Sequence, residues 1–279
     1  MSFIVTRFAP SPTGLLHIGH VFSALEGWRL ARDNGGRFLL RIEDIDRARC
    51  RDVFAQAILE DLTWLGIDWD GEVRRQSDHL GAYASVLAEL RARRLVYPCF
   101  CTRRQIAREV ELAQAAPHGP LGLVYPGTCR TLAAAEVEAR LEAGDHHAWR
   151  LDVAKALDET GPLVWRTFEG STIPADAGTA GDVVVARKDI PTSYHLAVTH
   201  DDHVQGVTVV TRGCDIAPAT HVHCLIRGLM GWKEPLHHHH RLLLAEDGRR
   251  HAKRDRSVTV RSLREAGLAP EDVLAMAHP

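Results

Sequence analysis

Residues 7–20 read Arg7-Phe8-Ala9-Pro10-Ser11-Pro12-Thr13-Gly14-Leu15-Leu16-His17-Ile18-Gly19-His20, and they carry the strongest structural signal in the chain. Apolar and β-branched residues at 3–8 favour a strand, the prolines and Gly14 favour a turn, and residues 16–31 favour a helix. A helix that starts directly after such a turn offers free N–H groups and the positive end of its dipole. The stretch therefore predicts a phosphate site, where Gly19 lets a nucleotide approach the backbone.

His17 and His20 stand three residues apart, so a helix would present both on one face of its first turn. Two histidines at this spacing are, in general, more often surface or capping residues than catalytic ones. Their position in a strand-to-helix crevice, where open α/β sheets bind ligands, favours the functional interpretation. His17, Gly19 and His20 are therefore candidate nucleotide-binding residues.

The chain outward from this stretch alternates strands with helices, which predicts an α/β fold with a parallel, doubly wound sheet. Further strands are expected at 38–42, 183–186 and 207–211, with helices at 52–65, 77–93 and 218–229. The composition of the chain changes from residue 96, where cysteines and a Pro/Gly-rich stretch follow. This change predicts an inserted subdomain with strands near 148–153 and 163–168. The expected units are 1–95 and 181–245 for the two halves of the catalytic domain, 96–180 for the insert, and 246–279 for a basic loop and short helices.

The composition is that of an ordinary globular protein, with 45% hydrophobic and 25% charged residues in a chain of 279. It excludes a disordered, collagen-like or coiled-coil chain. No apolar run approaches the roughly 20 residues that a bilayer requires, and Arg7 interrupts any signal peptide. We therefore expect a soluble, cytoplasmic protein with no membrane partner. The chain has 34 basic and 36 acidic residues, so its net charge is close to zero. A positively charged surface that binds nucleic acid would therefore have to be a local patch.

A second turn, Arg41-Ile42-Glu43-Asp44-Ile45-Asp46, places three carboxylates directly after a predicted strand. Acids in such a position are ordinarily solvated loop residues, and we expect this of Asp46. Glu43 would lie at the carboxyl end of its strand, beside the first turn. It is therefore a candidate to receive a ligand ammonium group.

Six cysteines are too few for a disulfide scaffold, and three of them, Cys99, Cys101 and Cys129, fall within one stretch. The spacing Cys-x-Cys is weaker evidence for a metal than paired Cys-x-x-Cys. A metal site and a group of structural thiols both remain open from spacing alone. The other three cysteines, Cys50, Cys214 and Cys224, are expected to be buried thiols.

Lys253 lies in a basic loop, Asp247-Gly248-Arg249-Arg250-His251-Ala252-Lys253-Arg254-Asp255. Such a run is by default a solvated charged segment. The alternative is a cationic loop that closes on a triphosphate and neutralises developing charge.

Taken together and in this order, these segments resemble the class I glutamyl-tRNA synthetase group. Residues 7–14 are similar to its opening strand and turn, His17-Ile18-Gly19-His20 to its nucleotide signature, and 41–46 to its acidic turn. Three later segments, 194–198, 201–208 and 212–215, are similar to the second half of the same catalytic domain. The resemblance implies a Rossmann-type catalytic sheet with an inserted zinc-containing subdomain.

The resemblance also implies roles for single residues. Glutamate would contact Arg7, Phe8, Ala9, Pro10, Ser11, Glu43, Tyr194 and Arg212. ATP would lie on His17, Gly19, His20 and Lys253, with His17, His20 and Lys253 as the catalytic residues and Mg²⁺ carried by ATP. A structural Zn²⁺ would be held by Cys99, Cys101, Tyr125 and Cys129.

The chain ends about 25 residues after Lys253, where a glutamyl-tRNA synthetase continues into an anticodon-binding region. We therefore expect no anticodon-binding domain, and the short form resembles the glutamyl-queuosine tRNA(Asp) synthetases. That resemblance implies activation of L-glutamate with ATP in the absence of tRNA, then transfer to queuosine in the anticodon stem-loop of tRNA(Asp), by a monomer. A non-catalytic tRNA-binding paralogue and a glutamate activator for another acceptor are the alternatives.

Two features depart from the group's pattern. Its second signature, Lys-hydrophobe-Ser-Lys, is replaced here by Arg250-His251-Ala252-Lys253, so only the last lysine is retained. The run His237 to His240 has no counterpart in the pattern. It could suggest a metal site or a tag, but we expect it to be an accident of a loop leading into a strand.

Overall fold

The first strand, β1 (Val5–Phe8), pairs in parallel with β2 (Arg37–Ile42), which pairs in parallel with the short β3 (Arg74–Arg75). These elements are taken from a computed structural model that describes residues 3–112, 118–119, 122–243 and 258–277. Helix α1 (Ile18–Arg32) packs closely on β1 at Gly27, whose carbonyl accepts a hydrogen bond from Thr6 Oγ1 at 2.7 Å. A Cβ at Gly27 would lie 2.9 Å from Thr211 Oγ1, so this close approach needs glycine.

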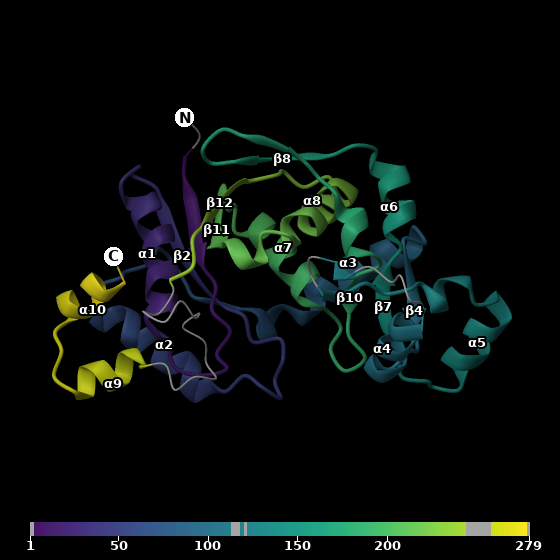
Figure 1. Ribbon diagram of the computed structural model, residues 1–279, viewed down its shortest axis with the longest axis horizontal. Helices are drawn as coiled ribbons and strands as arrows, with labels where there is room; N and C mark the ends of the chain where they lie inside the picture. The colour runs from purple at the N-terminus through teal and green to yellow at the C-terminus, as the bar shows by residue number, and fades with distance from the viewer. Residues whose placement is uncertain (1–2, 113–117, 120–121, 244–257, 278–279) are drawn as a thin grey trace.

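The second half of the sheet lies on the other side of β1. Strand β11 (Val209–Gly213) pairs in parallel with β12 (Leu236–His240), and β12 pairs in parallel with β8 (Val164–Thr167). The Thr208 amide donates to the Val5 carbonyl at 2.9 Å, which joins the two halves. The predicted parallel sheet is confirmed, and its carboxyl ends form one edge (Figure 1).

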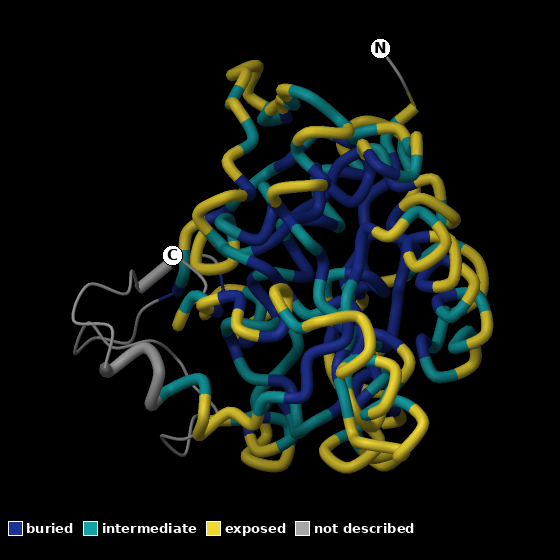
Figure 2. Tube along the Cα trace, turned by 90° about the vertical axis from the view of Figure 1, so that its right-hand side faces the viewer, coloured by how far each residue is buried: buried dark blue, intermediate teal, exposed yellow. Residues whose placement is uncertain are grey.

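Helices lie on both sides of this sheet (Figure 1), and the buried segments lie within a shell of exposed ones (Figure 2). The buried residues form two large apolar cores. One core packs α1 and β2 against α2 (Asp52–Trp64), α9 (Val260–Glu265) and α10 (Pro270–Met276). The other lies among α3 (Leu80–Ala92), α6 (Val153–Thr160), α7 (Tyr194–Val204) and α8 (Ala219–Met230). No helix in the described ranges is long and apolar enough to cross a membrane.

Two strands lie in sheets other than those we expected. Strand β10 (Val184–Ala186), predicted to rejoin the parallel sheet, instead pairs antiparallel with β7 (Ala148–Leu151), which also pairs antiparallel with β4 (Val96–Cys99). Strand β8, predicted within the insert, extends the catalytic sheet and carries β9 (Thr172–Pro174) at its edge. Short buried runs do not reveal which sheet they join, and the expectation that residues 183–186 resume the parallel sheet was wrong. The proposed unit boundaries at 95/96 and 180/181 remain predictions.

The remaining elements of the described chain are short. They are α4 (Arg103–Leu112), α5 (Ala134–Glu142), β5 (His118–Gly119), β6 (Gly122–Leu123) and the 3₁₀ turns Gln76–His79, Thr128–Thr131, Ala177–Ala180 and Cys214–Ile216. The run His237 to His240 lies within β12, so the expectation of a strand at this point is confirmed. Its side chains bind neighbours on both faces, including Glu234, Glu26 and Ser23.

Candidate active site

A cavity of about 590 Å³ opens at the carboxyl ends of β1, β2 and β11. The backbone brings its walls together, because Glu43 N donates to the Pro10 carbonyl and Arg51 N to the Pro12 carbonyl, both at 3.0 Å. The turn after β2 is thereby fixed against the turn after β1. All of the residues that we predicted to contact glutamate line this cavity: Arg7, Phe8, Ala9, Pro10, Ser11, Glu43, Tyr194 and Arg212.

The two arginines of the cavity differ in how they are held. Arg7 is buried, and its Nε donates to Asp202 Oδ1 at 3.0 Å while its Nη1 donates to the Thr211 carbonyl at 2.7 Å. Arg212 is equally buried, but its only described acceptor is His223 Nδ1, 3.1 Å from Nη1. Its Nε and Nη2 are enclosed and have no hydrogen-bond partner among the described residues. Buried guanidinium N–H groups in this state provide a binding site for an acceptor such as a carboxylate.

Asp202 is the electrostatic centre behind the cavity. Its carboxylate accepts from Arg7, from Arg41 Nη1 at 2.9 Å and from Arg227 Nη2 at 3.3 Å, and it is 1% exposed. Burial opposes its ionisation, but the arginines outweigh burial and lower the pKa of Asp202 far below its usual range. Arg41 and Arg227 also lie 3.4 and 3.5 Å from Glu43 and Glu234, whereas no carboxylate among the described residues pairs with Arg212.

Glu43 provides a carboxylate at the same cavity. Its Oε1 lies 3.4 Å from Arg41 Nη2, and its side chain is 12% exposed. Burial raises the pKa of Glu43, against the opposing effect of Arg41 and Arg7. A half-buried carboxylate whose nearest described cation lies at 3.4 Å gains from a ligand cation, so the geometry suits an ammonium group.

Asp46 corrects one prediction. We expected a solvated loop acid, whereas Asp46 is buried, lines the cavity and accepts from Arg187 Nη1 and Arg49 Nε, each at 2.8 Å. Burial opposes its ionisation, but the two arginines outweigh it and lower the pKa of Asp46 to about 2. Its partner Arg187 comes from a segment 141 residues away, which no local pattern could indicate.

The start of α1 forms a smaller cavity of about 350 Å³ beside the first, lined by His17, Gly19 and His20. His17 caps the helix, since its Nδ1 accepts from Gly19 N at 3.1 Å, and His20 Nδ1 accepts from His17 N at 3.2 Å. His20 lines both cavities. The capping and ligand-facing interpretations of these histidines are therefore compatible, because both side chains lie at the helix start.

Lys253 lies outside the described residues, as does the rest of the basic loop from Asp247 to Asp255. The described segments on either side of that loop lie at the smaller cavity. Leu242 and Leu243 line it, while Thr259 forms a β-bridge with His17, and Val260 N donates to the Leu16 carbonyl at 2.9 Å. Both described flanks of the segment that contains Lys253 are thus held beside the start of α1.

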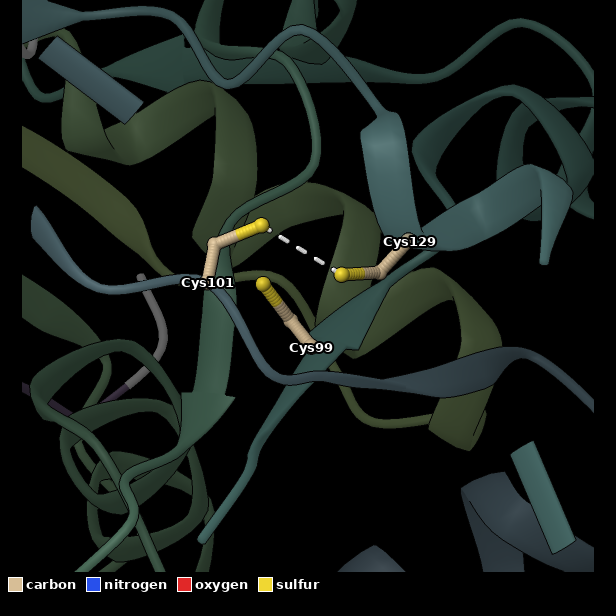
Figure 3. A group of neighbouring side chains, drawn as sticks. All are labelled: Cys99, Cys101 and Cys129. Carbon is tan, nitrogen blue, oxygen red and sulfur yellow. Dashed lines mark hydrogen bonds between the residues drawn. The ribbon is translucent and has the colours of Figure 1, made fainter. Parts of the chain in front are cut away.

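The cysteine cluster, drawn in Figure 3, does not contribute to the lining of this cavity. Cys99 ends β4, and the Sγ atoms of Cys99, Cys101 and Cys129 lie within 4.8 Å of one another and point toward a common centre. A tetrahedral zinc with Zn–S bonds of about 2.3 Å would need sulfurs about 3.8 Å apart. Tyr125 Oη lies 3.6 Å from Cys101 Sγ and accepts from Cys129 N at 2.8 Å. All four predicted ligands are therefore gathered, and the cluster could hold a metal ion.

The three cysteines outside the cluster differ in exposure. Cys224 is buried on α8, as we expected, whereas Cys50 is half-buried and Cys214 is exposed. Cys214 opens the 3₁₀ turn that follows β11, where the chain leaves the sheet for the surface. The expectation of a buried thiol was therefore wrong for Cys214.

Our sequence analysis assigned no role to Asp202, Arg41 or His223. A signal was present for Arg41, because a charged residue within the apolar strand 38–42 requires a buried partner. The adjacent acids Asp201 and Asp202 on α7 give a similar signal. His223 carried none, since a single histidine on a helix is compatible with many environments.

Comparisons with known proteins agree with this arrangement. A family model described as "tRNA synthetases class I (E and Q), catalytic domain" matches residues 3–277. A Rhodobacter capsulatus protein named glutamyl-Q tRNA(Asp) synthetase is 45% identical, covering 97% of this chain and 98% of its own. A Syntrophus aciditrophicus protein named glutamate–tRNA ligase 2 is 37% identical over 96% of this chain and 55% of its own.

Among solved structures, the glutamate-tRNA synthetase of Elizabethkingia anophelis superimposes with a TM-score of 0.81 at 28% identity. The match covers 99% of this chain and 61% of that one. The fold, the composition of the cavity and the family model all lead to the same assignment. The chain belongs to the class I tRNA synthetases of the E and Q group and carries their ligase catalytic domain.

Proposed function

We propose that the protein activates L-glutamate with ATP, without tRNA, and transfers the glutamyl group to queuosine in the anticodon stem-loop of tRNA(Asp). The single observation that carries the first step is Arg212, which lines the cavity and whose buried Nε and Nη2 have no described partner. Together with Arg7 and Glu43 it offers two cations and one anion, which is the complement of an amino acid with two carboxylates.

Activation is then a matter of positioning and electrostatics. Arg7 and Arg212 would hold the two carboxylates, Glu43 the ammonium, and Tyr194 would add a phenolic hydrogen bond. ATP would lie on His17, Gly19 and His20, with Lys253 at the triphosphate. Mg²⁺ brought with ATP supplies further charge neutralisation. An oxygen of the α-carboxylate attacks the α-phosphorus, the bond to the bridging oxygen breaks, and pyrophosphate leaves.

The second step needs no covalent enzyme intermediate. A hydroxyl of the modified nucleoside attacks the carbonyl carbon of the glutamyl-adenylate, AMP leaves, and the hydroxyl proton passes to solvent. The choice of queuosine as acceptor is supported by the name of the Rhodobacter relative, at 45% identity against 37% for the glutamate–tRNA ligase. We further propose that the cysteine cluster with Tyr125 binds a structural Zn²⁺, that the protein acts as a monomer, and that the predicted unit boundaries hold.

The test of activation is exchange of labelled pyrophosphate into ATP with single amino acids, in the absence of tRNA. Glutamate should support exchange, while glutamine and aspartate should be far weaker substrates. Glutamine would leave a buried guanidinium without its anion, a mismatch that costs a factor of about 10² or more. Exchange with glutamine as fast as with glutamate would contradict the use of two arginines for two carboxylates. A protein without exchange for any amino acid would favour the non-catalytic alternative.

A further inference from the structure

Arg212 is held from behind by a chain of two histidines. Its Nη1 lies 3.1 Å from His223 Nδ1, and His223 Nε2 lies 3.2 Å from His195 Nδ1. His223 is 0% exposed on α8, and the Tyr194 ring packs against it with its centroid 5.5 Å away. Tyr194 and His195 are the first residues of α7. The two hydrogen-bonded histidines therefore connect α7 and α8 with Arg212 near the end of β11.

The hydrogen bonds fix the state of both rings. Arg212 has only donors, so His223 Nδ1 must accept and carry no proton. The proton of a neutral His223 is then on Nε2 and is donated to His195 Nδ1, whose own proton must lie on Nε2. Protonation of His223 at Nδ1 would place two N–H donors against each other at 3.1 Å, beside a buried guanidinium. The geometry therefore requires a neutral histidine at position 223.

This arrangement contrasts with that of Arg7. The charge of Arg7 is matched by Asp202, whose two oxygens are occupied by three arginines in total. Arg212 is oriented by an acceptor that has no charge, and no carboxylate hydrogen bonds to it among the described residues. Its position is thus fixed, while no described carboxylate is hydrogen-bonded to its guanidinium group.

We propose that His223, supported by His195, is a positioning residue that sets selectivity for an anionic substrate side chain. It holds the Arg212 fork toward the cavity and, being neutral, keeps the cation available for a carboxylate. A carboxylate at position 223 would satisfy Arg212 internally and remove the preference for an acid over its amide. This inference rests on the proposed activation of glutamate.

The test compares three replacements of His223 in the full chain, with pyrophosphate exchange measured for glutamate and for glutamine. His223→Asn retains a neutral acceptor, His223→Leu removes it, and His223→Asp adds a charge. We expect His223→Asp to raise the KM for glutamate on the order of 10²-fold with a smaller change for glutamine, because the substrate carboxylate loses its counter-ion. His223→Asn should stay within about threefold of the wild type, and His223→Leu should weaken both substrates.

His221→Asp is the matched control. It lies two residues earlier on α8, and its Nδ1 accepts from Asp176 N at 2.9 Å, on a different side from Arg212. It should leave the ratio of glutamate to glutamine unchanged. Thermal unfolding of each variant identifies those that fail to fold. If His223→Asp does not fold, His195→Phe is measured in its place. This variant loses the partner that orients His223, so the KM for glutamate should rise while kcat changes less.

Two outcomes would overturn the proposal while the proposed function stands. One is wild-type selectivity in a folded His223→Asp protein. The other is equal loss in all three variants of His223, which would indicate a purely structural role. If the wild type shows no exchange, calorimetric titration with glutamate and glutamine measures the same selectivity as binding. A wild-type protein that neither exchanges nor binds glutamate would overturn both proposals.

Discussion

The charged residues that line the cavity and those that contact them determine which ligands the site can bind. Arg7, Arg41 and Arg227 form ion pairs with Asp202. The side chain of Arg212 is hydrogen-bonded, among the described residues, only to the neutral His223. The positions of Arg7, Glu43 and Arg212 at a common site could be predicted from their motifs. The buried partners that set their charge could not, because Asp202 is 195 residues from Arg7 in the sequence and the ion pair exists only after folding.

Replacement of Asp202 tests this electrostatic centre. Asp202→Asn should lower the free energy of unfolding at pH 7 by about 3 to 5 kcal/mol, because three buried arginines lose their anion. The folded pKa of Asp202 lies below the value of about 3.9 in the unfolded chain, so its stabilisation is present above pH 4 and is lost as the pH falls. Urea unfolding at pH 7, 5, 4 and 3 should show the gap between variant and wild type closing below pH 4.

Asp158→Asn is the control for that series, since Asp158 is exposed on α6 and makes no described ion pair. Its effect should stay within about 0.5 kcal/mol at every pH. If the difference in unfolding free energy between Asp202→Asn and the wild type stayed constant down to pH 3, the three arginines would not be stabilising the ionised carboxylate of Asp202.

Lys253 remains a prediction from the sequence, supported by the described segments that flank its loop near His17. Lys253→Ala should slow pyrophosphate exchange on the order of 10²-fold, with a smaller change in the KM for glutamate, because a cation at the triphosphate acts mainly in the transition state. Arg250→Ala should have the weaker effect. Equal losses in the two variants would show that Arg250 shares the cationic role.

The elements could be predicted more accurately than their pairing. Strands at 3–8, 38–42 and 207–211 and the helix at 16–31 correspond to β1, β2, β11 and α1, since turn residues bound each of them in the sequence. The sheets that β8 and β10 join could not be predicted, because a short apolar strand is equally suited to either sheet. Helix α4 was not predicted at all, because most of its residues are polar, although Ile106 and Val110 stand one helical turn apart.

The region around the cysteine cluster, within the predicted insert, is expected to depend on its cysteines for stability. Around the cluster, its apolar contacts are limited to residues such as Phe100, Ile106 and Leu132. Elemental analysis should find about one zinc per chain, and Cys99→Ser or Cys129→Ser should remove it and increase hydrogen exchange between residues 96 and 130. Cys224→Ser, a buried thiol elsewhere, should retain the metal. Metal-free protein with the same protection in this region would make the cluster a set of structural thiols.

At the scale of the whole molecule, nearly balanced charge requires any surface for tRNA to be local. Six arginines between residues 91 and 108 could form such a surface, but not all of them are available. Arg91 lies over the Trp149 ring at 4.3 Å, and Arg93 binds Glu159 and the Leu229 carbonyl. Arg94, Arg103 and Arg104 are exposed, which leaves them as candidates for phosphate contacts. The side chain of Arg108 lies outside the described residues.

The identity of the acceptor distinguishes this proposed function from the alternatives, because activation alone is shared with every glutamate-specific member of the family. Labelled glutamate and ATP should be supplied with tRNA that carries queuosine and with tRNA from cells that lack it, each before and after periodate oxidation of the 3′-terminal ribose. We predict glutamylation only of the queuosine-containing tRNA, and at the same level after periodate. Glutamylation of tRNA(Glu) that periodate abolishes would contradict the account and make the 3′ end the acceptor.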